Sequence, residues 1–307
     1  MERKWIILLV LVGAAFLLIY AGLFLLILLP SNAGRIMPGQ EIALIRIDGV
    51  ISASGAGEGL LSGAGTSSEN IIRQLRRAAG DDSIKAILLR IDSPGGTAAA
   101  SEEIYIEVKR IKKPVIVSVA DTGASGAYLI ACGADKIVAN SASAVGSIGT
   151  IMTIPNFEKL FKKLGIEYVI IAQGEHKSLG HPSRSITKEE EKILAEQSRI
   201  VYEQFVDYVA EGRKLPRDEV KEFANGLTFP GTQALKMGLI DRIGNYQDAV
   251  DLSAKMGKIK GEPVIVEYEA PNLSEWLGQI FQGKGAGFQK MLVPGYLQFP
   301  LQQLILR

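Results

Sequence analysis

The feature that most constrains the fold is a series of short apolar runs that alternate with segments of helical spacing. The runs are continuously apolar, which is typical of strands covered on both faces. Strand, turn, helix and strand in succession predict an α/β domain. The first two runs share an L-x-R-I-D core about 44 residues apart, which indicates a repeated structural unit. The predicted strands are 42–49, 86–93, 114–121, 135–141 and 167–174, and the predicted helices are 67–80, 101–111, 126–134, 156–165 and 186–214.

The first thirty residues predict a membrane anchor. Residues 5–29 contain no charge, and at 1.5 Å per residue such a helix would cross the roughly 30 Å hydrocarbon core with some tilt. A cleaved signal peptide is the alternative, because "SNA" at 31–33 resembles a cleavage site, although its apolar region would be only about 7–15 residues. Arg3 and Lys4 precede the run, so we expect a cytoplasmic N-terminus. The protein would then cross the cell membrane once, with the rest of the chain on the extracytoplasmic side.

The rest of the chain divides into a linker, one domain and an extension. The glycine-rich stretch 54–65 is predicted to be a mobile surface loop. Thr187 and Glu190 predict a capping box at the start of the longest helix. The expected divisions are the anchor at 1–30, the linker at 31–41, the main domain at 42–260 and the C-terminal extension at 261–307.

Composition excludes several classes of function. The 34 basic residues are balanced by 33 acidic ones, which argues against a nucleic-acid partner. Cys132 is the single cysteine, so no intramolecular disulfide can form, and we interpret it as a small buried residue. The sequence has no Cys/His cluster, no HExxH and no GxxxxGK[ST] loop. We therefore expect no metal and no nucleotide.

The stretch "DTGASGAYLI", residues 121–130, predicts a nucleophile. It follows an apolar strand and leads into helical spacing, and the smallest residues surround Ser125. A strand-to-helix turn that exposes one serine is a way in which hydrolases present a nucleophile.

Two kinds of base are compatible with this serine. His176 and His181 lie together after the apolar run at 167–174, and a Ser–His–Asp triad would use one of them. Lys177 lies between them, and a lysine can act as base where a dry site lowers its pKa from about 10.4 toward 7–8. Residue chemistry alone leaves both bases open.

A set of ordered motifs resembles the signal peptide peptidase A family. The motifs are "IDSPGG", "TGASGAY" and "VGSIGT", followed by a lysine 52 residues after Ser125, and the resemblance covers residues 42–255. The family consists of membrane-anchored serine proteases with a Ser/Lys dyad. The resemblance implies a Clp-protease/crotonase-type fold, a spiral of repeated β-β-α units. This chain is similar to the short type with one catalytic domain.

The resemblance also assigns roles to residues. It implies Ser125 as the nucleophile, Lys177 as the general base and Ser147 as a serine that orients the lysine. A plain turn serine is the alternative for Ser147. Glycines present backbone N–H groups without a Cβ in the way, so we expect Gly126 and one glycine of "SPGG" to form the oxyanion hole. The sequence does not distinguish Gly95 from Gly96.

We therefore expect a serine endopeptidase at the outer face of the membrane, and the resemblance implies remnant signal peptides and other apolar peptides as its substrates. The resemblance implies no metal or organic cofactor. It suggests a homo-oligomeric ring, with an octamer as the expected size, in which one copy lends Lys177 to the Ser125 of a neighbour. The alternatives are a related protease acting on stomatin-like membrane proteins, a crotonase-type acyl-CoA enzyme, and a catalytically silent scaffold.

Overall fold

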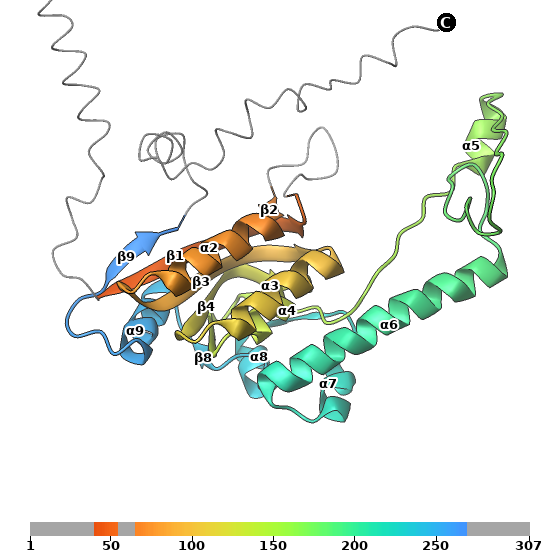
Figure 1. Cartoon of the computed structure of the whole chain (residues 1–307). Coiled ribbons are helices and arrows are strands. Elements are labelled where there is room, and N and C mark those ends of the chain that lie inside the picture. Colours follow the sequence, from red (N-terminus) through yellow and green to blue (C-terminus); the bar gives the residue numbers. More distant parts are fainter. Residues whose placement is uncertain (1–39, 55–64, 269–307) are drawn as a thin grey trace, which may run out of the picture. The chain divides into compact units, whose positions relative to one another are not determined.

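The structure of the chain is a computed structural model that describes residues 40–54 and 65–268 (Figure 1). Several sequence predictions fall outside these residues: the anchor at 5–29, the linker up to residue 39, most of the glycine-rich loop and the extension beyond residue 268. Within the described residues, no helix combines the length and the apolar character needed to cross a bilayer.

A largely parallel sheet lies at the centre of the described residues (Figure 1). Its strands are β1 Glu41–Ser52, β2 Thr66–Ser67, β3 Ile84–Gly96, β4 Val115–Ala124, β5 Lys136–Ala139, β6 Ala144–Gly146, β7 Thr228–Pro230, β8 Arg242–Ile243 and β9 Val264–Glu267. The main path runs β2-β1-β3-β4-β5-β8, and every neighbouring pair on it is parallel. Outside this path, β9 pairs with β1, β6 pairs in parallel with the end of β4, and β7 pairs with β6 in the antiparallel direction.

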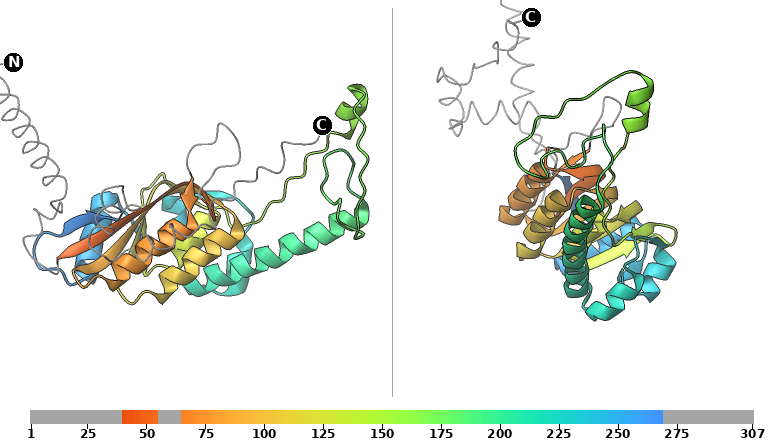
Figure 2. Two further views of the ribbon diagram at one scale, coloured as in Figure 1. Left: turned by 45° about the horizontal axis from the view of Figure 1, so that its top comes forward. Right: turned by 90° about the vertical axis from the view of Figure 1, so that its right-hand side faces the viewer.

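Helices cover both faces of this sheet. They are α2 Ser68–Gly80, α3 Ala98–Arg110, α4 Gly126–Cys132, α5 Glu158–Lys163, α6 Lys188–Arg213, α7 Arg217–Phe223, α8 Gly231–Lys236 and α9 Tyr246–Met256. α2, α3 and α4 pack in a row on one face, and α9 packs on the other (Figures 1 and 2). Successive residues of β1 divide accordingly, because Ala43 and Ile45 join the core under α2–α4 while Ile42 and Leu44 join the core under α9. This confirms the prediction of strands covered on both faces.

The two L-x-R-I-D cores lie side by side in the sheet. Arg46 pairs with Arg90 and Asp48 pairs with Asp92 in the parallel register of β1 and β3. Because the strands are parallel, the turns that follow β1, β3 and β4 meet at one edge of the sheet. The motifs "IDSPGG" and "TGASGAY" are therefore brought together at that edge.

Most predicted elements are present. Four of the predicted strands correspond to β1, β3, β4 and β5, all predicted helices are found, and Thr187 and Glu190 form the predicted capping box of α6. The predicted strand at 167–174 is wrong, because this segment is irregular and its Val169 and Ile171 are 87% and 90% exposed. A strand needs a partner for its backbone N–H and C=O groups, and no described strand lies beside this segment.

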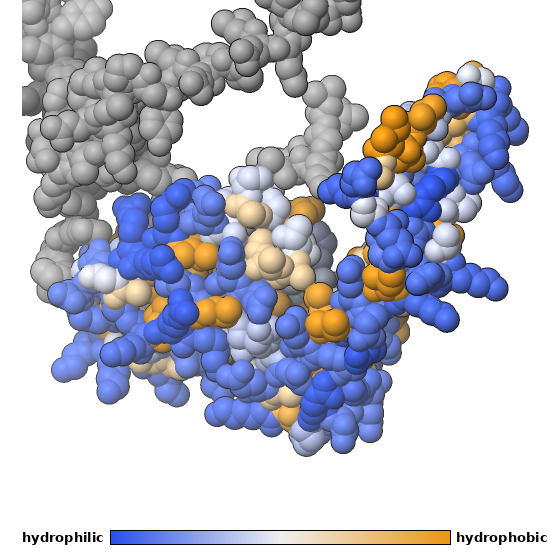
Figure 3. Space-filling model, turned by 45° about the vertical axis from the view of Figure 1, so that its right-hand side comes forward, coloured by the Kyte–Doolittle hydropathy of each residue, from blue (hydrophilic) through white to orange (hydrophobic). Residues whose placement is uncertain are grey.

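Residues 150–187, which we call the arm, carry an unusual amount of exposed apolar surface. The arm leads from the end of the sheet through α5 to the start of α6, which extends beyond the sheet (Figures 1 and 2). Apolar side chains are visible on its surface in Figure 3. Patches of this kind mark interaction surfaces in soluble domains. The large apolar side chains exposed in the arm are Ile151, Met152, Phe157, Leu160, Leu164, Ile166, Tyr168, Val169, Ile170 and Ile171.

Candidate active site

Ser125 lies at the turn between β4 and α4. Its backbone has φ 53° and ψ −126°, a positive-φ conformation that residues other than glycine rarely adopt. The turn is held by the Ser125 N–H, which donates to the Gly146 carbonyl at 2.7 Å, and by the Leu129 N–H, which donates to the Ser125 carbonyl at 2.9 Å. The half-buried hydroxyl makes no hydrogen bond to any described residue. Backbone strain of this kind persists where the surrounding structure enforces it, and here it presents a hydroxyl.

The glycines around the turn allow backbones to approach closely. A Cβ on Gly126 would lie 2.2 Å from Ser101 Oγ, and a Cβ on Gly95 would lie 2.7 Å from the Gly126 nitrogen. A Cβ on Gly96 would lie 1.8 Å from the carbonyl oxygen of Ile51. Gly95 also has φ +100°, which favours glycine. Each of these positions therefore excludes any side chain.

The amide of Gly96, rather than that of Gly95, is directed toward the turn. The Gly95 N–H donates to Ser93 Oγ at 3.1 Å. The Thr97 N–H donates to a β1 carbonyl at 2.9 Å, and successive amides of a strand point to opposite sides, so the Gly96 N–H points toward β4. Its nitrogen lies 3.3 Å from the place a Cβ on Gly126 would take. Gly126 begins α4, so its own N–H has no partner within the helix.

Ser147 lies beside Ser125 because β6 pairs with β4 in register. Ala124 is opposite Gly146, so the two serines are the next residues of neighbouring strands, and both have φ 53°. The Ser147 hydroxyl donates to the Gly226 carbonyl at 3.1 Å. A hydroxyl that donates one hydrogen bond can still accept others, so Ser147 can receive a further donor.

A groove of about 1190 Å³ opens beside Ser125. The ends of β1 and β3, the first turns of α3 and α4, the start of the arm and the middle of α6 form its walls. Glu102 is the single charged residue among the described residues that line it. The Tyr208 hydroxyl donates to the Glu102 carboxylate, and this hydrogen bond, together with burial, raises the pKa of Tyr208 to about 12.

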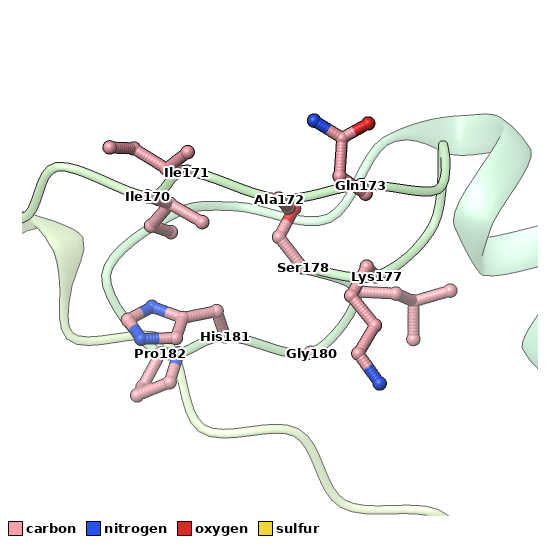
Figure 4. A pocket seen from close by; sticks show the side chains of 10 residues that line it. Ile170, Ile171, Ala172, Gln173, Lys177, Ser178, Gly180, His181 and Pro182 are labelled. Atoms are coloured by element: carbon pink, nitrogen blue, oxygen red, sulfur yellow. The ribbon is translucent and has the colours of Figure 1, made fainter.

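Lys177 does not meet Ser125 within one chain. It is exposed and lines a pocket formed by the arm residues 170–173 and 177–182 (Figure 4). This pocket shares no residue with the groove beside Ser125. The structure therefore brings Ser125, Ser147, Gly96 and Gly126 together and leaves Lys177 apart from them.

The two histidines are also placed in the arm. His176 is exposed, and His181 contacts the arm itself, with its Nδ1 2.8 Å from Ser183 Oγ and its ring against Tyr168 at 5.3 Å between centroids. Within the described part of the chain, no hydrogen bond joins either imidazole to Ser125.

The loop that carries Lys177 is tied to the start of α6. Arg184 donates through Nη1 to Glu190 Oε2 at 2.9 Å and through Nη2 to Ser178 Oγ at 3.0 Å. Glu190 also accepts the Thr187 N–H at 2.9 Å. These hydrogen bonds, that from Arg184 first, lower the pKa of Glu190 to about 2. The anchored loop presents Lys177 near the start of α6.

Sequence reasoning missed two buried serines that shape the site. The Ser93 hydroxyl donates to the Gly49 carbonyl at 2.6 Å and so fixes the "SPGG" turn. Ser101 is fully buried against the turn at the start of α4. The sequence could have indicated its burial, because Ser101, Ile104 and Val108 follow the spacing of one buried helical face.

Comparisons with known proteins define the class. A model of peptidase family S49 matches residues 107–260, and a model of the Clp protease family matches residues 64–145. A protein of Methanocaldococcus jannaschii that is provisionally named as a protease is 36% identical to this chain. The alignment covers 87% of this chain and 87% of the length of that protein. An Enterococcus faecium protein provisionally named signal peptide peptidase SppA is 35% identical, over 78% of this chain and 71% of its own. The chain belongs to peptidase family S49, and it is a serine protease.

A solved structure shares the fold. A mutant of the 1510-N membrane-bound stomatin-specific protease aligns with a TM-score of 0.50 and 18% sequence identity, over 77% of this chain and all of that one. At this identity the likeness concerns the fold alone. The predicted α/β fold of the Clp-protease type, with a largely parallel sheet, is confirmed.

Proposed function

We propose that the chain is a membrane-anchored endopeptidase with a Ser/Lys dyad, in which Ser125 is the nucleophile and Lys177 the general base. The observation that carries the proposal is the Ser125 turn. Its strained backbone presents to a large groove a hydroxyl that makes no hydrogen bond to any described residue, next to the N–H groups of Gly96 and Gly126. Nucleophile and oxyanion donors in this arrangement fit acyl transfer.

The proposed reaction proceeds through an acyl-enzyme. Neutral Lys177 takes the Ser125 proton as Oγ attacks the peptide carbonyl carbon, and it then protonates the leaving amine. Gly96 and Gly126 donate N–H groups to the oxyanion, each such donor being worth about 10²–10³ in rate. We prefer Gly96 to Gly95 because the Gly95 N–H already donates to Ser93. Water then hydrolyses the ester and restores the serine.

The lysine is supplied by a neighbouring copy in this proposal. Within one chain Lys177 and Ser125 line separate pockets, while the apolar surface of the arm is left exposed. Docking of the arm on the next copy would bury that surface and carry Lys177 to Ser125, where the Ser147 hydroxyl can accept from the amine. Repeating such a head-to-tail contact closes a ring, for which an octamer is the expected size.

The proposed substrates are remnant signal peptides at the outer face of the membrane. One relative carries the name of a signal peptide peptidase, and the groove is lined mostly by small and apolar residues.

Residues 5–29 would hold the domain at the membrane. Protease added outside intact cells should then digest the domain. Protection until lysis would show that the orientation is reversed.

Labelling with a fluorophosphonate probe tests the nucleophile. The full-length protein in detergent should be labelled and should cleave signal peptides, while Ser125→Ala should do neither. Ser141→Ala, which changes an exposed serine of the same region, should behave as wild type. Undiminished labelling and cleavage by Ser125→Ala would refute the proposal. Mapping cleavage sites by mass spectrometry, with signal peptides and stomatin-like peptides in parallel, separates the two proteolytic alternatives.

A further inference from the structure

Glu102 introduces one negative charge into the groove, whose other described lining residues are uncharged. It lies on the first turns of α3, directly after Ser101, whose side chain packs against Gly126 at the catalytic turn. No lysine or arginine is among the described residues that line the groove. The carboxylate therefore lies close to the path of a bound peptide.

A hydrogen bond positions the Glu102 carboxylate, and no described cation pairs with it. The Tyr208 hydroxyl is its hydrogen-bond donor within the described residues, and no ion pair joins Glu102 to a described cation. Tyr208 is in turn held by Tyr105, with ring centroids 4.7 Å apart. An ionised carboxylate accepts at about four lone-pair positions, so the described residues leave most of the hydrogen-bonding capacity of Glu102 unused. A positioned, half-buried anion of this kind favours a cation that arrives with the ligand.

We infer that Glu102 binds the cationic side chain of a lysine or arginine in the peptide substrate. The inference rests on the proposed protease function and adds a charge requirement to it. The favoured substrate has one basic residue next to an apolar run, with the apolar residues against the uncharged walls and the cation at Glu102. Signal peptides have this pattern where the basic n-region meets the apolar h-region.

A matched peptide series tests this inference. Peptides of one apolar sequence, acetylated and amidated at their ends, carry lysine, norleucine or glutamate at each position around the scissile bond in turn. At one position the wild type should have a kcat/KM for the lysine peptide about tenfold above that for the norleucine peptide. In Glu102→Gln this ratio should fall to about one. Glu102→Lys should instead favour the glutamate peptide.

Two further variants separate the charge from the local structure. Glu103→Gln removes the neighbouring carboxylate, which faces Ser68 outside the groove, and should keep the tenfold ratio. Tyr208→Phe removes the hydrogen bond to Glu102 but keeps the charge, and should also keep a clear preference for lysine. Each ratio is taken within one variant, so a general loss of activity cancels.

A ratio near one at every position in the wild type would overturn the inference, and so would a lysine preference that survives in Glu102→Gln. The first result is the one expected if Glu102 served only to bind Tyr208 or a cation of a neighbouring copy. If no peptide is cleaved at all, the proposed protease function fails instead, and the two failures are thereby distinguished.

Discussion

Replacing Gly126 by alanine would place a methyl group where the protein has no space. The new Cβ would lie 2.2 Å from Ser101 Oγ and 3.0 Å from Ser101 Cβ, and Ser101 is fully buried. Contacts below 3.0 Å essentially never occur for a real Cβ, so the buried Ser101 side chain or the start of α4 must shift, by up to about 1 Å. The N–H groups of Gly96 and Gly126, the proposed oxyanion donors, would then be displaced relative to each other.

The expected loss of activity follows from that displacement. Removing one oxyanion donor typically lowers kcat by about 10²–10³, and a misplacement of about 1 Å can cost about 10². Overpacking of this kind also lowers the free energy of unfolding by about 1–3 kcal/mol. We therefore expect Gly126→Ala to lose at least about a hundredfold in kcat/KM while it still folds.

A second substitution should restore part of the activity. Ser101→Gly removes the two atoms nearest to the new methyl group and leaves only the Gly96 nitrogen, at 3.3 Å, among its three nearest neighbours. The cost is about 1 kcal/mol for glycine within a helix. The assay is peptide hydrolysis together with thermal unfolding, for both single variants and the double variant, with Gly80→Ala as control because nothing lies within 4 Å of its Cβ position. The double variant should be at least tenfold more active than Gly126→Ala. Near-normal activity of Gly126→Ala, or a loss that Ser101→Gly leaves unchanged, would refute the reasoning.

Three other predictions concern the arm and the core. Because the pKa of Glu190 is lowered to about 2, its pairing with Arg184 should hold the Lys177 loop in place above about pH 4.5 and should be lost as the pH falls toward 2. Amide hydrogen exchange should show that the loop amides lose protection over this range. In Glu190→Gln the same amides should be unprotected at every pH. His176→Ala should keep most of the peptidase activity and Lys177→Ala nearly none, while activity in Lys177→Arg would count against a lysine base, since a guanidinium stays protonated. Burial raises the pKa of Cys132 to about 12, as expected for the small buried residue that was predicted, so a thiol reagent should label it only on unfolding.

Patterns within one segment predicted the fold well. Continuous apolar runs identified β1, β3, β4 and β5, and the Thr187–Glu190 pair located the start of α6, because these signals depend on neighbours along the chain. The small residues around Ser125 likewise predicted its strand-to-helix turn. The geometry then adds what spacing could not supply: the Gly95 amide is engaged by Ser93, whereas that of Gly96 points to the turn.

Features that depend on distant partners were beyond the sequence. The run at 167–174 has the composition of a strand, but pairing is decided by which strands lie beside it, and the described sheet offers none. The distance between Ser125 and Lys177 along the chain likewise says nothing about whether they meet in one copy or between two. Glu102 drew no attention because a charged residue on a helix is usually solvated, and only the groove reveals its position.

Mixing two inactive variants tests the shared active site most directly. Ser125→Ala and Lys177→Ala are unfolded together in equal amounts and refolded, and mixed oligomers are verified before peptide hydrolysis is measured. If each site takes its serine from one copy and its lysine from the next, random assembly gives about one intact site in four. The predicted result is activity near a quarter of that of wild type. Verified mixed oligomers without activity would show that both residues act within one chain.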